Sequence, residues 1–216
     1  MKALICKDCL LTRWVHGLAL AFGLLILPIG LDKPEAFLFF TLFMQLMYIH
    51  LMYNLTRPGL CAGKENLLLG SLPLRRGNVV TAKYAFYFGC VLLYPLYQCI
   101  LIWVTTLFGV ALPFPLWIHF LMPAILGVLY CAIMLPAAYI SPKWSGVLSM
   151  LIYLAIIILP QRLPQWLGIE TDVKTALASM ASALRSWSLP VLFVICLGLM
   201  CISMQTSRHF YKKTEF

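Results

Sequence analysis

The sequence predicts an all-α polytopic membrane protein, with residues 1–216 forming a single transmembrane domain of six spans. The first reason is composition: 62% of the 216 residues are hydrophobic, 11% are charged, and the mean hydropathy is +0.93. Soluble domains are about half apolar and about a quarter charged, so the bilayer must solvate much of this chain. The second reason is that the apolar residues fall in runs of about 20, the helical length that crosses a bilayer core of about 30 Å.

Six apolar runs have roughly this length, and each is predicted to form a helix. They are residues 14–31, 36–53, 83–112, 116–140, 145–159 and 187–205. The fifth run is the shortest, and residues 161–166 are a candidate continuation of it at the interface. No small-residue cleavage site closes the charged start, so we expect no cleavable signal peptide.

The positively charged residues predict the orientation of the spans. Six spans place the N-terminus, residues 54–82, the turn at 141–144 and the C-terminus on one side. That side, counted with Lys83, holds twelve basic and three acidic residues, whereas the other side holds four of each. Because Lys and Arg are enriched in cytoplasmic loops, both termini are expected in the cytoplasm. The same bias, together with anionic headgroups, accounts for the basic balance, so no nucleic-acid partner is expected.

The spans carry no Asp or Glu away from their ends. Charged groups at membrane depth mark proton relays and other functional sites, so this absence argues against carriers with carboxylate relays and against aspartyl intramembrane proteases. The polar candidates that remain are His16, His50 and His119. His16 and His50 lie near the cytoplasmic ends of the first two spans. Two hypotheses stay open for them: ligation of a b-type haem, or polar contacts at the interface and between helices.

The eight cysteines include one pair with metal-ligand spacing, Cys6 and Cys9. A single CxxC supplies half of a tetrahedral zinc site, and the only other cysteine expected in the cytoplasm is Cys61. We therefore predict no metal site, and no structural disulfide because no cysteine lies clearly in an external loop. Residues 59–65 have the wrong spacing for a phosphate-binding loop and no Ser or Thr after the lysine. No catalytic residues are predicted.

A charged, Pro-broken segment, residues 63–76, separates the second and third spans. Gly63 and Gly70 bracket enough residues for about two helical turns, and Pro73 favours an extended residue before it, so no helix runs straight through. Leucines on such a short cytoplasmic helix would be exposed to water, and an exposed apolar patch is typical of a docking surface. The alternative is that they lie in the interface or back on the bundle. The leucines concerned are Leu67, Leu68 and Leu69.

A second insert, residues 161–188, precedes the last span on the outer side. Thr171 is a candidate N-cap, with Asp172 near the start of the predicted helix and Arg185 near its end, as the helix dipole favours. One stripe of this helix is apolar: Val173, Leu177, Met180, Leu184 and Trp187. From the residues alone, we expect an interfacial helix on the outer leaflet.

Three stretches resemble the membrane subunits of ATP-binding-cassette exporters, the type-2 ABC permease family. The first is the start MKALICKD, with a Lys-Asp pair before the first span. The second is Glu65 followed by SLPLRR at 71–76, similar to the family's acidic residue and its Ser-Leu-Pro turn. The third is VVTAKY at 79–84, similar to the beginning of the family's third span. Six spans within 216 residues also fit the small permeases of this family.

The resemblance implies a role for each of these segments. Residues 1–13 would be an amphipathic connector helix along the inner leaflet, with Lys7 and Asp8 reaching water or headgroups. Residues 63–76 would hold a cytoplasmic coupling helix, seated in a groove of an ABC ATPase subunit. The implied coupling residues are Lys64, Glu65, Asn66, Leu67, Leu68, Leu69, Leu72, Pro73, Arg75 and Arg76. Residues 161–188 would carry an external gate, which consists of Val173, Leu177, Met180 and Leu184.

As a whole, the resemblance implies the permease subunit of an ATP-driven exporter in a bacterial plasma membrane. The partner ATPase would use ATP and magnesium, and this chain would bind no cofactor. A second permease, identical or a sister chain, would complete the transporter. Apolar spans suit an amphipathic peptide, an antimicrobial or a lipid-like substrate. Two other classes stay open: a substrate-binding or accessory subunit of an uptake system, and a haem or metal enzyme using His16 and His50.

The predicted orientation is testable by accessibility. A tag inserted after Gly70 should react with a membrane-impermeant label only in permeabilised cells, because residues 54–82 are predicted to lie inside. A matched tag inserted after Ile169 should react in intact cells. Labelling of the first tag in intact cells would contradict the topology.

Overall fold

The computed structural model describes residues 2–32, 34–56, 76–107, 115–166 and 188–213, and the side chains of these ranges except 26–37, 76, 142 and 156–166. The described ranges form six α-helices and no strand, as the predicted all-α class requires. The helices are α1 (Lys2–Asp32), α2 (Pro34–Thr56), α4 (Arg76–Leu107), α5 (Leu116–Ile140), α6 (Pro142–Trp166) and α8 (Ser188–Lys213).

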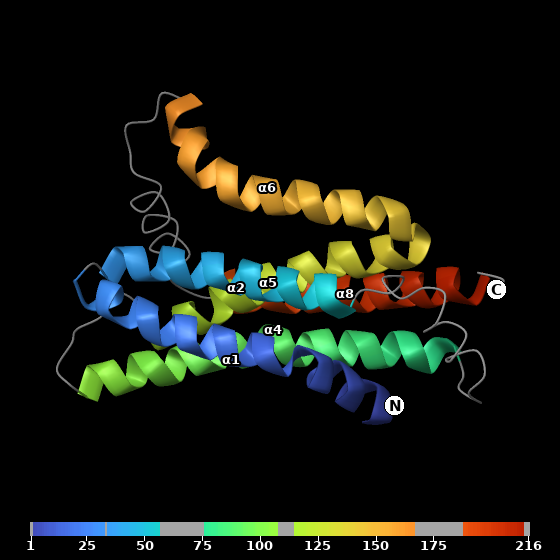
Figure 1. Cartoon of the computed structure of the whole chain (residues 1–216), viewed down its shortest axis with the longest axis horizontal. Coiled ribbons are helices and arrows are strands. Elements are labelled where there is room, and N and C mark those ends of the chain that lie inside the picture. The colour runs from blue at the N-terminus through green and yellow to red at the C-terminus, as the bar shows by residue number, and fades with distance from the viewer. Residues whose placement is uncertain (1, 33, 57–75, 108–114, 167–187, 214–216) are drawn as a thin grey trace.

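Successive helices run in opposite directions along one bundle (Figure 1). One end of the bundle therefore gathers the first residues of α1, the end of α2, the start of α4, the junction of α5 with α6 and the end of α8. This is the grouping that six spans require. α6 stands apart from the other helices over much of its length, and its main neighbours are α5 and α2.

Five helices are long and apolar enough to cross a membrane. Their spanning ranges are Lys2–Leu25, Leu38–Thr56, Gly77–Leu107, Leu116–Ile140 and Ser188–Lys213. α6 has 25 residues, about 37 Å of helix, but its apolar part with described side chains, Lys143–Ala155, is shorter than a span. Five of the six predicted spans are therefore confirmed, and the crossing by α6 stays a prediction.

Three helices depart from their predicted boundaries. Residues 1–13 and 14–31 were expected to form separate helices, but α1 is continuous from Lys2 to Asp32. α4 begins at Arg76 rather than at residue 83, and α8 continues to Lys213 rather than ending at residue 205. A formed helix gains one hydrogen bond for each residue added, so it continues through polar residues where hydropathy alone would end a span.

α5 forms the centre of the bundle and packs against α2, α4, α6 and α8. Gly127 marks its closest approach to two of them. A Cβ atom at this position would lie 2.7 Å from Gln45 Nε2 of α2 and 3.0 Å from Val91 Cγ1 of α4. Gln45 Nε2 also donates to the carbonyl oxygen of Val91 at 3.3 Å. Three helices thus meet at Gly127 with no room for a side chain.

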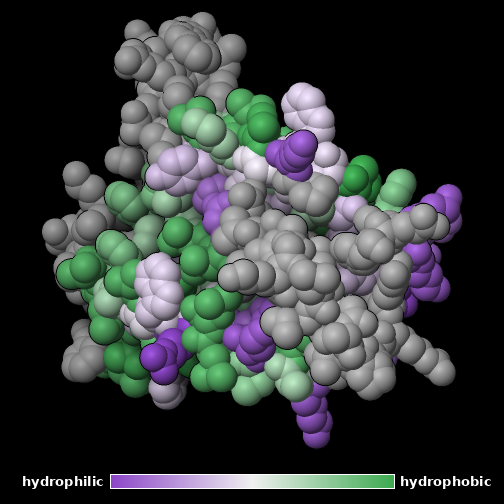
Figure 2. Space-filling view, turned by 45° about the vertical axis from the view of Figure 1, so that its right-hand side comes forward, coloured by the Kyte–Doolittle hydropathy of each residue, from purple (hydrophilic) through white to green (hydrophobic). Residues whose placement is uncertain are grey.

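Apolar side chains make up much of the described surface on the face that Figure 2 shows. Many large ones are strongly exposed, among them Leu25, Leu107, Met150 and Val194 on four different helices. Soluble monomers rarely expose apolar patches of this extent. The exposed side chains therefore identify the lipid-facing surface of a multi-pass membrane protein.

The close approach at Gly127 yields a stability prediction. Gly127→Val should lower the thermal unfolding midpoint of the purified protein, because forcing methyl groups into a filled contact typically costs about 1–3 kcal/mol. Gly198→Val is the matched control, since a Cβ at this α8 glycine meets no atom within 4 Å. Equal midpoints for the two variants would contradict the packing.

Candidate functional site

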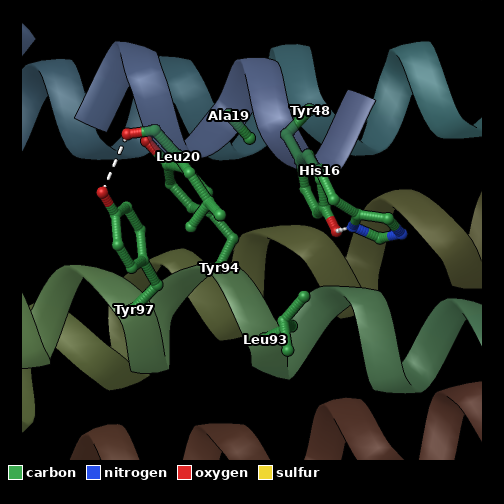
Figure 3. Close-up of a pocket in the computed structure, with 7 residues that line it drawn as sticks. All are labelled: His16, Ala19, Leu20, Tyr48, Leu93, Tyr94 and Tyr97. Atoms are coloured by element: carbon green, nitrogen blue, oxygen red, sulfur yellow. Dashed lines mark hydrogen bonds between the residues drawn. The ribbon is translucent and has the colours of Figure 1, made fainter. Parts of the chain in front are cut away.

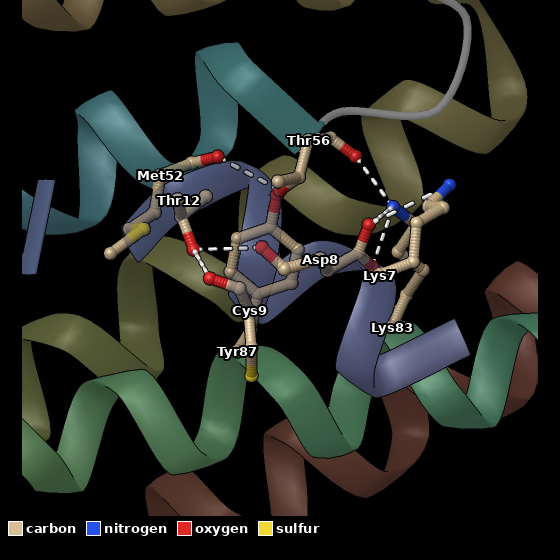
Figure 4. Close-up of polar contacts among 8 residues, drawn as sticks. All are labelled: Lys7, Asp8, Cys9, Thr12, Met52, Thr56, Lys83 and Tyr87. Atoms are coloured by element: carbon tan, nitrogen blue, oxygen red, sulfur yellow. Dashed lines mark hydrogen bonds and ion pairs between the residues drawn. The ribbon is translucent and has the colours of Figure 1, made fainter. Parts of the chain in front are cut away.

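A buried ion pair joins α1 to α4 at the end of the bundle that holds the termini. Asp8 is 2% exposed and Lys83 is 7% exposed. The Lys83 ammonium lies 2.8 Å from Asp8 Oδ2 and 2.9 Å from Oδ1 (Figure 4). Two opposite charges in a low-dielectric site attract strongly, but burying them is also costly unless every donor finds an acceptor.

The third donor of the ammonium reaches α2. Lys83 Nζ donates to the carbonyl oxygen of Thr56 at 2.9 Å, and Thr56 is the last residue of α2. The last carbonyls of a helix lack partners within the helix and carry its negative dipole end. Lys83 therefore satisfies one of them with a positive charge, and all three of its N–H groups have acceptors.

Three hydroxyl groups complete the arrangement. Thr56 Oγ1 lies 2.6 Å from the Tyr87 hydroxyl, one turn after Lys83, and donates to the Met52 carbonyl at 2.8 Å. Thr12 Oγ1 donates to the Asp8 carbonyl at 2.8 Å. We call Asp8, Thr12, Thr56, Lys83 and Tyr87 the Asp8 cluster. The cluster fastens α1, α2 and α4 together through polar contacts buried among apolar side chains.

The Asp8 cluster lies where α2 ends and α4 begins. Thr56 directly precedes the segment 57–75, and α4 begins at Arg76 directly after it. Lys83 is seven residues, about two turns, into α4. The same ammonium thus holds the residue before the segment and the first turns of the helix after it.

The two histidines considered as haem ligands, His16 and His50, have hydrogen-bond partners at their ring nitrogens. His16 Nδ1 lies 2.8 Å from the Tyr48 hydroxyl, and His16 Nε2 lies 3.3 Å from Thr12 Oγ1. His50 Nδ1 lies 2.9 Å from the Tyr130 hydroxyl, and His50 Nε2 lies 2.9 Å from Asn54 Nδ2. A haem ligand must offer a free ring nitrogen, whereas all four are engaged here. The geometry therefore favours the interhelical contacts that were the alternative.

The contacts of His50 extend to α6. Asn54 Oδ1 accepts a hydrogen bond from Ser149 Oγ at 3.0 Å, and the ring of Tyr153 stacks on His50 at 5.2 Å between centroids. An amide NH₂ group only donates, so in the neutral imidazole Nε2 accepts and Nδ1 donates to Tyr130. This chain of polar groups fixes the first half of α6 to α2 and α5.

A third set of hydrogen bonds holds α8. The Tyr84 hydroxyl of α4 lies 2.7 Å from Ser203 Oγ and 2.8 Å from Ser207 Oγ. Arg208 also donates to Thr81 Oγ1 of α4 at 2.5 Å. All six helices are consequently linked through side-chain hydrogen bonds toward the end that holds the termini.

The predicted connector residues behave differently from each other. The Lys7 side chain is 45% exposed and lies 3.7 Å from Asp8 Oδ1, as expected for a residue that reaches water or headgroups. The same expectation for Asp8 is wrong, because Asp8 turns inward to pair with Lys83. Cys6 and Cys9 are both exposed and free.

The other predicted sites fall largely outside the described residues. Lys64, Glu65, Asn66, Leu67, Leu68, Leu69, Leu72, Pro73 and Arg75 of the coupling segment lie outside them, as do Val173, Leu177, Met180 and Leu184 of the external gate. Arg76 is described only as the first residue of α4. Among the described residues, no group of three His, Cys, Asp or Glu side chains could hold a metal ion.

Sequence reasoning missed the pairing of Asp8 with Lys83. The two residues are 75 positions apart, so no local pattern connects them. The available signal was their isolation: Asp8 is the one acid at the start of the first apolar region, and Lys83 is the one cation at the start of the third.

Long apolar helices, a lipid-facing surface and a buried charge pair between helices define a multi-pass helical membrane protein. The profile described as ABC-2 family transporter protein matches residues 3–212, and the chain belongs to this family. Membership indicates a transport membrane subunit, and the family implies association with an ATPase subunit. No curated protein and no solved structure matches the chain.

The Asp8 cluster predicts unequal effects for two neighbouring charges. Asp8→Asn should lower the thermal unfolding midpoint strongly, because leaving one buried charge of a pair typically costs about 3–5 kcal/mol. Lys7→Gln should change it little, since exposed ion pairs contribute about 0–1 kcal/mol. Unfolding in a fixed detergent would measure both.

A double variant separates lost charge from lost packing. Asp8→Leu combined with Lys83→Met leaves no unpaired charge and should recover much of the stability that Asp8→Asn loses. Equal losses for Asp8→Asn and Lys7→Gln, or no recovery in the double variant, would contradict this account of the cluster.

Proposed function

We propose that this protein is the permease subunit of an ATP-driven exporter in a bacterial plasma membrane, with both termini in the cytoplasm. It would move an amphipathic peptide, an antimicrobial or a lipid-like molecule outward. A separate cytoplasmic ABC ATPase would bind ATP and magnesium and dock on residues 63–76. Two permeases, identical or sister chains, and two ATPases would form the working unit.

The Asp8 cluster is the observation that carries this proposal. A push on the segment between α2 and α4 is useful only if both helices respond together. Lys83 holds the end of α2 through the Thr56 carbonyl and holds α1 through Asp8. Three helices would therefore move as one body when the ATPase dimer closes, as transitions between packed states require.

The continuous form of α1 supports the same mechanism. Its 31 residues make a helix about 46 Å long, in which the amphipathic start and the membrane span share one backbone. The start was expected to be a separate connector along the membrane. Contact between the ATPase and residues before Asp8 would instead act directly on the whole of α1. The ion pair would pass this movement to α4.

Charge supports the orientation. The end of the bundle with both termini carries the exposed basic residues Lys2, Lys7, Arg13, Lys212 and Lys213. Lys and Arg at one end of a set of spans favour the cytoplasm. An ATPase that binds there has direct access to the segment between α2 and α4.

Reversing one charge in the segment tests the proposal. Glu65→Lys should abolish stimulation of the co-purified ATPase by the permease and should abolish export, while insertion into the membrane persists. The physical reason is that Glu65 is expected to meet a basic or amide group of the ATPase. Glu215→Lys, an identical charge change near the C-terminus, is the matched control and should leave stimulation intact.

Three results would contradict the proposal. They are normal export by the Glu65→Lys protein, equal losses in the Glu65→Lys and Glu215→Lys proteins, and failure of any ABC ATPase to co-purify with the wild-type chain. ATP turnover by reconstituted complexes, with and without the permease, gives the readout.

A further inference from the structure

A cavity of about 270 Å³ lies between α1 and α2, with one side chain of α4 at its back. Its α1 wall is a single stripe with helical spacing, Val15, Leu18, Ala19 and Phe22. These positions extend about 10 Å along the helix axis. The α1 lining therefore runs along the helix axis, and we call this cavity the slot.

The α2 wall runs in the opposite direction along the same slot. Phe43, Met47 and Leu51 line it, over about 12 Å of helix. Relative to the apolar runs 14–31 and 36–53, the lining positions lie toward the end that joins residues 57–75. The slot thus lies within one leaflet. One leaflet of a hydrocarbon core of about 30 Å is about 15 Å deep.

The polar atoms nearest the slot are already engaged. The Tyr48 hydroxyl is bonded to His16 Nδ1, and the Tyr94 hydroxyl accepts from Gln98 Nε2 at 2.8 Å. The two tyrosine rings stack at 5.5 Å between centroids with an interplanar angle of 24°, and Figure 3 shows them beside His16. What the tyrosines present to the slot is ring surface.

An apolar cavity of this size is not a stable place for water. Cavities of about 150 Å³ lined by apolar side chains stay dry and take up benzene or xenon, and this slot is larger. Leaving it empty would forfeit the dispersion contacts of its walls. Its chemistry therefore calls for a hydrocarbon.

The slot opens toward the membrane. Leu18 and Phe22 on α1 and Leu51 on α2 line it and are exposed at the surface of the bundle. All three lie within the membrane-spanning ranges Lys2–Leu25 and Leu38–Thr56. The medium at the opening is therefore the acyl chains of the leaflet, which run in the same direction as the slot.

We propose that this slot binds one acyl chain of a phospholipid from the leaflet at the 57–75 end of the bundle. Its length is close to the depth of one leaflet, its walls are apolar and aromatic, and its opening faces the chains that would fill it. Met47 supplies a flexible side chain that adapts to an irregular hydrocarbon. The inference does not depend on the ATPase or on the transported substrate.

Ala19 is the position that sets the space available. It lines this slot and also a second cavity of about 50 Å³ toward α4, which includes Leu93 and Tyr97 (Figure 3). Ala19 is the α1 residue common to both linings, and its side chain is a single methyl group. A larger side chain at this position would fill the hydrocarbon site from the α1 wall.

Photolabelling with a lipid tests the proposal. The full chain is placed in nanodiscs of phosphatidylglycerol and phosphatidylcholine that contain a phosphatidylcholine with a diazirine at mid-chain. After irradiation, mass spectrometry should find α1 and α2 labelled at Leu18, Phe22 and Met47 several-fold more than the lipid-exposed α8 residues Val191 and Val194.

Two filling variants and one control complete the experiment. Ala19→Leu and Met47→Trp, which fill the slot from opposite walls, should each reduce labelling of the slot to the level of α8. Gly17→Leu should leave it unchanged, because a Cβ at Gly17 meets no atom within 4 Å. Unaltered labelling of α8 and a monodisperse elution profile show that each variant is folded.

Three outcomes would overturn the proposal. One is equal labelling of the slot and of α8 in the wild-type chain. Another is slot labelling that persists in both filling variants. The last is a disulfide between two copies of a Leu18→Cys protein together with no slot labelling. This result would show that a second copy of the chain, rather than a lipid, covers the opening.

Discussion

The attraction between one buried carboxylate and one buried ammonium organises the end of this bundle that holds the termini. Two opposite charges removed from water are stable only when their remaining donors and acceptors are satisfied. Lys83 meets this condition with the two oxygens of Asp8 and the carbonyl of Thr56. Because each partner comes from a different helix, α1, α2 and α4 are held in one arrangement at this end. Sliding one helix past another would leave an unpaired charge in a medium of low dielectric.

The remaining helices are held by a different balance of forces. α5 contacts its neighbours through close packing, with Gly127 at the tightest point, and packing rather than hydrophobic exclusion is what brings helices together in lipid. α8 and α6 add hydroxyl and amide contacts, through Tyr84 with Ser203 and through Asn54 with Ser149. The polar contacts concentrate toward one end, whereas α6 departs from the bundle toward the other (Figure 1). The arrangement has one fastened end and one looser end.

The sequence was sufficient for the class, for the reversal of direction from helix to helix and for the boundaries of the span at 116–140. Hydropathy determines these features, and α5 is the most apolar helix. It was insufficient where a polar residue belongs to a buried contact: Asp8 looks like one residue of an amphipathic face until Lys83 is seen opposite it. The docking residues around Glu65 and the gate residues around Met180 remain predictions, because they lie outside the described part of the chain.

The capped end of α2 has a consequence for how such a protein can diverge. Lys83 satisfies one carbonyl at the terminus of α2 and lies in the first turns of α4, so it ties these two helices by a contact that does not run through the stretch between Thr56 and Arg76. A change in the composition of that stretch leaves this tie in place. Under the proposed function, one membrane scaffold would in this way accept different cytoplasmic ATPases.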